Sequence, residues 1–169
     1  MDPLELEVRR KIYQTILKNP GLHLRELQRR TALATGMLTY HLDVLENSGL
    51  IRSEVKEKRK CYFPHAFSYS RSSLIMFMRE SLPRKILLLL LEKPRKFEEI
   101  VELTGKSKSV ISTHLTRMLK AGIISATKQE NKHTYSLMEP EKVKETFITY
   151  RESFYDEALE RFIELYLEM

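Results

Sequence analysis

Apolar residues recur at helical spacing in two segments of the chain, at positions 35–51 and again at positions 108–124. The inward-facing positions predicted from this spacing are Leu38, Leu42 and Leu45 in the first segment and Ile111, Leu115 and Met118 in the second. Each run ends at a glycine, Gly49 in the first and Gly122, 73 positions later, in the second, and β-prone residues follow at once. The pattern therefore predicts an internal repeat in which a helix leads directly into a strand.

The order of elements predicted around each repeat is helix, strand, helix, helix, strand, strand. In the first half, Asp2 and Pro3 favour the start of a helix that ends before the Asn-Pro-Gly turn at 19–21. A short strand, a short helix and the helix that begins near position 35 follow. Two β-prone runs, at 50–54 and 61–63, then predict a hairpin whose loop holds residues 55–60. This order is typical of a winged helix domain.

The second half repeats this plan and adds a C-terminal extension. Residues 64–73 lose hydrophobic periodicity and gain serine, which predicts the connection between two domains. After Pro140, the apolar and aromatic positions predict one long amphipathic helix. We therefore expect a mainly α protein with small β hairpins, an α+β class, with two tandem winged helix domains and a long C-terminal helix. The predicted ranges are 1–66 for the first domain, 67–82 for a linker and connecting helix, 83–139 for the second domain and 140–169 for the C-terminal helix.

Charge is unevenly distributed along these ranges. The 169 residues carry 29 Lys and Arg against 23 Asp and Glu, a formal net charge of +6. Residues 1–70 contribute +4 and residues 71–139 contribute +6, whereas residues 140–169 contribute −4. Two basic domains favour a polyanionic partner, and an acidic tail is better suited to a protein contact.

A DNA-binding face is predicted on the second helix of each helix pair, because short polar side chains on an uncovered helix face can approach base edges and phosphates. Phosphate contacts are expected from nearby basic residues, above all in the predicted hairpin loop, for which a solvated tip is the alternative. The candidate contacts in the first domain are Arg25, Arg29, Arg30, Thr35, Gly36, Thr39, Tyr40, Lys56, Lys58, Arg59 and Lys60. Those in the second domain are Lys106, Lys108, Ser109, Ser112, Thr113, Thr116, Arg117, Lys128 and Lys132.

The C-terminal helix is expected to make the chain a homodimer, because its aromatic-rich face is too wide to remain uncovered. The predicted interface residues are Phe147, Tyr150, Phe154, Phe162, Ile163 and Tyr166. A ligand cavity lined by these aromatic residues is the less favoured alternative. Two-fold symmetry would call for a palindromic DNA site whose half-site centres lie a multiple of roughly 10 base pairs apart.

Two segments of the repeat resemble known DNA-binding regulators. Residues 107–124, SKSVISTHLTRMLKAGII, resemble the recognition segment of ArsR-type winged helix regulators, and residues 39–51, TYHLDVLENSGLI, resemble that segment in archaeal winged helix transcriptional regulators. The resemblance implies sequence-specific binding of double-stranded DNA, with Ser112, Thr113 and Thr116 in the groove and Thr39, Tyr40 and Asp43 as their counterparts. Metal-sensing members carry a cysteine pair in the recognition or preceding helix, whereas this chain has Cys61 alone. Metal sensing is therefore not expected.

Catalysis, cofactors and membrane insertion find no support in the sequence. A Gly-rich phosphate loop, a clustered set of metal ligands and a nucleophile motif are all missing, so neither an enzyme nor a cofactor is expected. His41 and His114 are expected to be structural rather than metal-binding. With one cysteine, no signal segment and no apolar run near the about 20 residues that span a bilayer, we expect a cytoplasmic protein without membrane contact. The sequence identifies no small-molecule effector.

Two functions fit these observations. The first is a DNA-binding transcriptional regulator, and the second is a winged helix protein-interaction scaffold within a transcription or chromatin assembly, without direct base readout. Residues 35–48 favour the second, because they contain two acids, Asp43 and Glu46, and no Lys or Arg. The regulator is the preferred interpretation, because the basic hairpin and the arginines of the preceding helix supply positive charge nearby.

Overall fold

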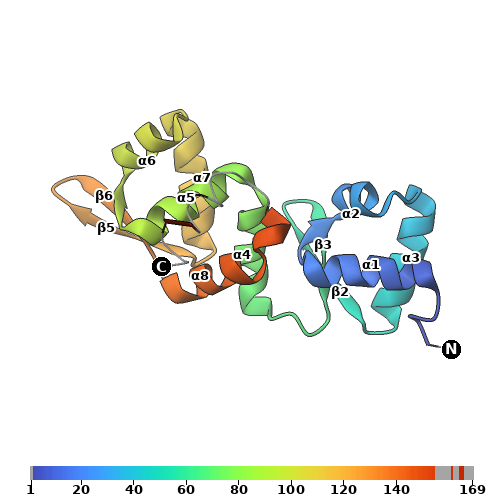
Figure 1. The fold of residues 1–169 in the computed structure, drawn as a ribbon. Helices are drawn as coiled ribbons and strands as arrows, with labels where there is room; N and C mark the ends of the chain where they lie inside the picture. Colours follow the sequence, from blue (N-terminus) through green and yellow to red (C-terminus); the bar gives the residue numbers. More distant parts are fainter. Residues whose placement is uncertain (1, 155–160, 162–163, 166–169) are drawn as a thin grey trace. The chain divides into compact units, whose positions relative to one another are not determined.

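The structure, a computed structural model, describes residues 2–154, 161, 164 and 165. The chain divides into two compact units, residues 1–75 and 76–169, and the boundary falls within helix α4 (Tyr69–Arg79). Each unit contains the predicted series of helices and strands (Figure 1). None of the helices formed by the described residues is long and apolar enough to cross a membrane.

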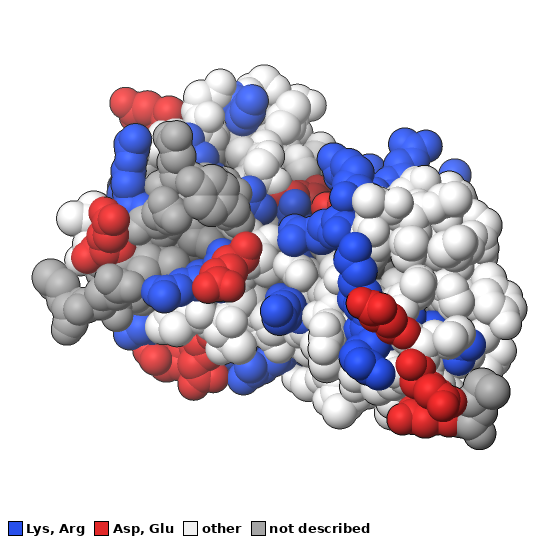
Figure 2. Space-filling view, turned by 45° about the vertical axis from the view of Figure 1, so that its right-hand side comes forward, with Lys and Arg blue, Asp and Glu red and all other residues white. Residues whose placement is uncertain are grey.

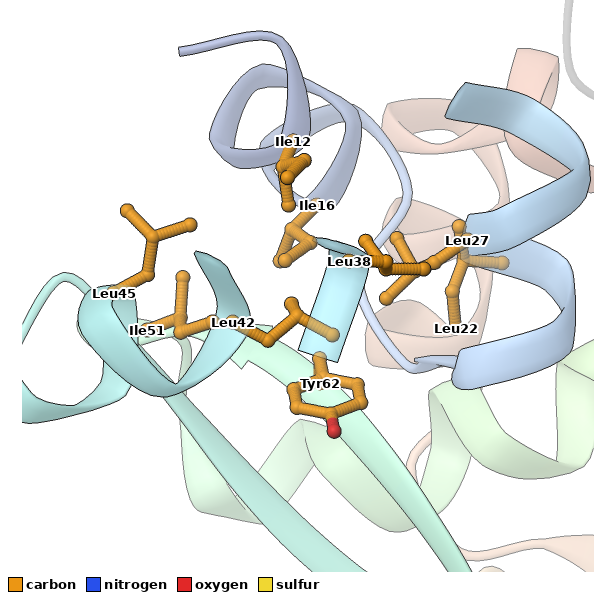
Figure 3. Close-up of a cluster of buried hydrophobic side chains, with 9 residues drawn as sticks. All are labelled: Ile12, Ile16, Leu22, Leu27, Leu38, Leu42, Leu45, Ile51 and Tyr62. Atoms are coloured by element: carbon orange, nitrogen blue, oxygen red, sulfur yellow. The ribbon is translucent and has the colours of Figure 1, made fainter. Parts of the chain in front are cut away.

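The first unit contains α1 (Glu7–Lys18), β1 (Leu22–His23), α2 (Leu24–Thr31), α3 (Thr35–Asn47), β2 (Ile51–Lys56) and β3 (Arg59–Pro64). Its strands form an antiparallel sheet in the order β1-β3-β2. Figure 3 shows apolar side chains from these helices and strands converging on one cluster, formed by Ile12, Ile16, Leu22, Leu27, Leu38, Leu42, Leu45, Ile51 and Tyr62. The three leucines of α3 that were predicted to face inward are completely buried, which confirms the helical spacing.

The second unit contains α5 (Ser81–Glu92), β4 (Arg95–Lys96), α6 (Phe97–Thr104), α7 (Lys108–Lys120), β5 (Ile124–Gln129) and β6 (Lys132–Leu137). From β4 to β6, every element has the bounds of its counterpart in the first unit shifted by 73 positions. The sheet is antiparallel in the equivalent order, β4-β6-β5, and the predicted inward residues of α7 are at most 2% exposed. The structure therefore confirms the internal repeat, the α+β class and the two tandem winged helix domains.

The two hairpins have longer strands and shorter turns than predicted. The expected loop at 55–60 is reduced to Glu57 and Lys58, with φ of 50° and 64°, and the second hairpin turns at Glu130 and Asn131, with φ of 46° and 61°. Positive φ at both central residues is what a two-residue type I′ turn requires, and its twist matches the twist of the flanking strands. The other basic residues of the predicted loop therefore belong to paired strands.

The segment predicted as an irregular connection is helical from Tyr69 onward and packs on the first unit. Arg52 of β2 donates a hydrogen bond to Oγ of Ser72 at 3.0 Å, and its guanidinium lies 3.7 Å from the centroid of the Tyr69 ring. Gly21 has a φ of 82°, and a Cβ at this position would lie 2.6 Å from Cγ2 of Ile75. Glycine is therefore required both by the backbone conformation and by the close approach of α4.

The first helix begins later than predicted. The Asp2 side chain accepts a hydrogen bond from the backbone N–H of Leu4 at 2.9 Å, and its carbonyl accepts one from the N–H of Glu5 at 3.0 Å. These bonds close a turn, and α1 starts at Glu7. The interpretation of Asp2 and Pro3 as a helix start is therefore wrong.

The C-terminal extension is not one continuous helix within the described residues. Helix α8 (Pro140–Thr149) ends at Tyr150, whose φ of −113° and ψ of 22° depart from helical values. A 3₁₀-helix, η1 (Arg151–Phe154), follows. The prediction of an uninterrupted helix from position 140 is therefore wrong, and most of the remaining extension lies outside the described residues.

Two of the predicted dimer residues, Phe147 and Phe154, are buried inside the second unit. They are 0% and 3% exposed, and their ring centroids lie 6.2 Å apart. The guanidinium of Arg79 lies 4.6 Å from the centroid of the Phe154 ring, and α8 packs against α5. The expectation that these two residues form an uncovered face is therefore wrong, because their own unit covers them. Tyr150 is half-buried, and Phe162, Ile163 and Tyr166 lie outside the described residues.

Candidate nucleic-acid interface

Each unit joins two helices by a three-residue turn, residues 32–34 between α2 and α3 and residues 105–107 between α6 and α7. Ala32 and Gly105 occupy the same left-handed position after the first helix, with φ of 58° and 65°. Their backbone N–H groups close the helix end by donating to the carbonyls of Gln28 at 2.9 Å and Val101 at 3.0 Å. The chain is thereby redirected, and the second helix of each pair starts at once.

The outer face of α3 is uncharged in its first turns and mixes small polar residues with two larger side chains. The inner face consists of Leu38, His41, Leu42 and Leu45. The exposed residues are Thr35, Gly36, Met37, Thr39, Tyr40, Asp43 and Asn47. The structure thus places all four predicted contact residues of this helix on its outer face. Met37 also lies on this face. The prediction did not include it, because it favoured short polar side chains, although Met37 lies three residues before the predicted contact Tyr40.

The outer face of α7 carries more hydroxyl groups. Its exposed residues include Lys108, Ser109, Val110, Ser112, Thr113 and Thr116. Oγ1 of Thr113 donates to the carbonyl of Ser109 at 3.0 Å, and Oγ1 of Thr39 in α3 donates to that of Thr35 at 2.8 Å. Because the proton of each hydroxyl is used within the helix, its oxygen lone pairs face outward as acceptors.

Basic residues of the first hairpin divide into two groups. Lys58 and Arg59 are exposed at the turn. Nζ of Lys60 donates to Oε2 of Glu46 at 2.8 Å, and this hydrogen bond raises the pKa of Lys60. Lys56 donates to a serine hydroxyl of α4 at 2.9 Å. The prediction treated the four residues as equivalent, whereas Lys56 and Lys60 are engaged within the unit.

In the second unit, the remaining basic candidates apart from α7 are exposed. Lys106 lies in the turn before α7, and Lys128 and Lys132 lie on the two strands of the hairpin. The turn between these strands, Glu130-Asn131, carries a negative charge where the first hairpin has Glu57-Lys58. The second hairpin tip is therefore the less basic of the two.

Arg117 has a structural role in the second unit. Its guanidinium donates to both carboxylate oxygens of Glu80, at 3.0 Å and 2.7 Å, and Nη1 lies 3.1 Å from Nδ1 of His114. The same guanidinium lies 5.2 Å from the centroid of the Phe77 ring. These contacts tie α7 to the residue between α4 and α5. The prediction of Arg117 as a DNA contact is therefore wrong, because an acid 37 positions earlier in the chain holds its side chain.

His41 also pairs with an arginine. Nε of Arg9 donates to Nδ1 of His41 at 3.3 Å, and both residues are buried. Burial, and secondly the positive charge of Arg9, lower the pKa of His41, which favours the neutral ring with Nδ1 as the acceptor. The structural interpretation of His41 is confirmed. Among the described residues, no group of three or more His, Cys, Asp and Glu side chains is arranged to hold a metal ion.

The surface charge does not define an interface by itself. On the side shown in Figure 2, patches of Lys and Arg alternate with patches of Asp and Glu and with wide uncharged areas. On this side (Figure 2), charges of both signs are therefore interspersed. The charges of the individual helices indicate more clearly than this view which helix of each pair could face phosphate.

Comparisons with known proteins bear on both units. Residues 6–74 match a family model described as an N-terminal HTH domain, and residues 83–126 match the model described as bacterial regulatory protein, arsR family. The chain carries two helix-turn-helix domains in tandem. It is 29% identical over 133 residues to an uncharacterized HTH-type transcriptional regulator of Methanocaldococcus jannaschii, an alignment that covers 79% of this chain and 34% of the relative. The chain therefore spans about a third of the length of that curated relative.

Solved structures with detectable similarity include HlyU from Vibrio cholerae and Rv0081 of M. tuberculosis. HlyU is 21% identical with a TM-score of 0.44, over 48% of this chain and 92% of that chain. Rv0081 is 23% identical with a TM-score of 0.44, over 56% of this chain and 89% of that chain.

The two HTH domains differ in which helix of the pair carries positive charge. In the first domain, α2 holds three Arg and one Glu (+2), and α3 holds one Asp and one Glu (−2). In the second domain, α6 holds three Glu (−3), and α7 holds two Lys and one Arg (+3). Arg25 and Arg29 of α2 are exposed, and Arg30 donates to the Asn19 side chain at 3.0 Å, which ties α2 to the end of α1. Because Arg117 is held by Glu80, the exposed charge that could complement phosphate is that of Arg25 and Arg29 on the first helix of one pair and of Lys108 and Lys120 on the second helix of the other.

Proposed function

We propose that the chain is a transcriptional regulator that binds double-stranded DNA sequence-specifically through both HTH domains. The observation that carries the proposal is the outer face of α3 and α7, which presents hydroxyl-bearing and other small side chains together with a few exposed apolar ones, while the opposite face of each helix forms the core of its domain. In HTH domains the second helix enters the major groove, where side chains of this kind reach base edges. The regulator names of the matched arsR model and of the archaeal relative support the same role.

The structure suggests a division of roles among the exposed residues. Base readout is assigned to Gly36, Thr39 and Tyr40 in the first domain and to Ser109, Ser112, Thr113 and Thr116 in the second. Phosphate contacts are assigned to Arg25, Arg29, Lys58 and Arg59 in the first domain and to Lys106, Lys108, Lys128 and Lys132 in the second. No residue is assigned a catalytic role.

One observation favours a second function, that of a protein-interaction scaffold. Helix α3 has no Lys or Arg, so the helix itself offers no attraction to phosphate. Lys60, which lies close to α3, is already paired with the acid Glu46. A scaffold would not need that attraction. Salt-dependent binding to duplex DNA separates the two functions, because only a regulator requires it.

The test is fluorescence anisotropy with a duplex selected from a random pool, compared with a scrambled duplex of the same composition over a range of salt concentrations. We expect a preference for the selected duplex, and a decrease of that preference in the Ser112→Ala/Thr113→Ala variant at an unchanged melting temperature. Thr149→Ala is the control, because it removes an exposed hydroxyl of the same unit from a different helix, α8. Equal affinity for both duplexes would contradict sequence-specific binding, and binding without salt dependence would favour the scaffold.

Homodimerisation stays a prediction, and the structure changes how it is tested. Truncation after Glu139 would remove Phe147 from the core of the second domain, so loss of a dimer there would not be informative. Truncation after Phe154 keeps α8 and η1 in place. We expect a dimeric full chain and a monomeric truncated chain by light scattering. If light scattering shows the same number of chains per particle for the full and the truncated protein, a dimer contact beyond Phe154 is contradicted.

A further inference from the structure

An exposed apolar residue stands at the third position of α3 and of α7, the helices to which the proposed function assigns base readout and which we call the reading helices. In α3 this residue is Met37, which is 50% exposed, and in α7 it is Val110, which is 40% exposed. The two positions are 73 residues apart and therefore equivalent in the repeat. Core packing does not account for them, because the inner faces of α3 and α7 are made by other residues.

In the first domain a second large side chain enlarges this apolar area. Tyr40 follows Met37 by three positions, so both lie on the same side of α3, and Tyr40 is 60% exposed. Its ring meets the ring of the buried His41 edge-on, with centroids 5.1 Å apart. The equivalent of Tyr40 in the second domain is Thr113. Single exposed apolar residues are common on protein surfaces, whereas these two recur at one position of both helices.

The chemistry of this position indicates its occupant. The first turns of a reading helix face the base edges in the major groove, and the apolar group there is the 5-methyl of thymine. No charged residue stands in α3 before Asp43, whereas exposed arginines of α2 and the basic turn of the first hairpin supply positive charge in the same unit. An apolar contact in a unit that also carries exposed phosphate-complementing charge fits a DNA groove better than a protein surface.

We infer that Met37 and Val110 contact thymine methyl groups, with Tyr40 extending the contact in the first domain, so that the preferred DNA has a thymine opposite the first turn of each reading helix. This inference rests on the proposed function. It makes Met37 and Val110 specificity-determining residues in addition to the hydroxyl-bearing residues assigned above.

The test replaces each thymine of the selected duplex, one at a time, by deoxyuridine, which keeps base pairing and removes only the methyl group. At one thymine or more for each domain, the affinity of the wild-type chain is expected to fall about fourfold, the value for one methyl-sized group buried. Met37→Ala is expected to abolish the effect at one of these thymines and Val110→Ala at the other. The matched controls are Leu17→Ala in α1 and Ile148→Ala in α8, whose side chains are 41% and 44% exposed, and both controls should retain every deoxyuridine effect.

Three outcomes would overturn the inference while leaving the proposed function intact. These are a selected site without thymine, full wild-type affinity for every deoxyuridine duplex, and deoxyuridine effects that persist in Met37→Ala and Val110→Ala. In each case the wild-type chain still prefers the selected over the scrambled duplex. A chain without that preference would overturn the proposed function as well.

Discussion

The two HTH domains share one backbone plan but differ in the source of their positive charge. In the first domain the charge comes from α2 and the hairpin turn, and the reading helix α3 is acidic. In the second domain α6 is acidic, and the reading helix α7 carries Lys108 and Lys120 on exposed positions. The core of a domain fixes where its second helix lies, whereas under the proposed function the exposed residues can complement DNA in different ways. We therefore expect the two domains to prefer different base sequences.

The largest expected effect comes from a cavity in one domain at a time. Leu42→Ala in the first domain and Leu115→Ala in the second each remove a buried side chain, at a cost of about 2 to 5 kcal/mol in the free energy of unfolding. Calorimetry should show that each variant lowers the transition of its own domain and leaves the other in place. Leu119→Ala, at a partly exposed position of α7, is the control. A joint shift of both transitions in either variant would contradict two separately folded domains.

The next effect concerns the charge of the first hairpin. Lys58→Ala/Arg59→Ala should flatten the slope of log K against log salt by about 1.8, since each neutralised phosphate contributes roughly 0.9. Lys56→Ala/Lys60→Ala removes the same formal charge but should change the slope less, because Lys60 is already paired with Glu46. Titrations of the same duplex with both variants give the comparison. Equal slopes would show that the division of the hairpin into engaged and exposed residues is wrong.

The sequence predicted the repeat, the sheet-forming segments and the inward faces of the helices, because burial periodicity is a local property of the chain. It could not predict pairs between residues far apart in sequence, such as Arg117 with Glu80 or Lys60 with Glu46. Counting basic residues therefore overestimated the charge available to DNA. The aromatic face after Pro140 has the same periodicity whether its own domain or a second chain covers it, and the structure shows that the domain covers Phe147.

A smaller effect is expected at Gly36, where stability and binding should change in opposite directions. Apart from its chain neighbours and the backbone of its own helix, no atom lies within 4 Å of a Cβ added at this position of α3, so alanine fits and should raise the free energy of unfolding by about 0.5 kcal/mol through its higher helix propensity. In the proposed complex the added methyl group separates α3 from the bases, and affinity should fall. Melting and anisotropy measurements on Gly36→Ala give both quantities, with Gln14→Ala, at an exposed position of α1 in the same domain, as control. A gain in both stability and affinity would contradict close approach of α3.

The smallest effect concerns pH and should be confined to the first domain. Burial and Arg9 lower the pKa of His41 below its usual value of 6.5, so the unfolded chain binds the proton more tightly than the folded one. The contribution of neutral His41 to the free energy of unfolding is therefore complete above pH 6.5. It is lost as the pH falls from there through the pKa of His41 in the folded state. His41→Gln should remove this loss from the first transition. Thermal melts between about pH 7.5 and about pH 5 test this, and an unchanged pH dependence in the variant would assign the loss to other groups.

The most direct test of two different reading domains is a base-pair substitution scan of the selected duplex. Every position is replaced in turn, and the affinities of the wild type, a Thr39→Ala/Tyr40→Ala variant and the Ser112→Ala/Thr113→Ala variant are measured. We predict, for each bound chain, two separate blocks of sensitive base pairs with unlike sequences, with each variant losing sensitivity in one kind of block and keeping it in the other. A single block, or the loss of both blocks in either variant, would contradict the account.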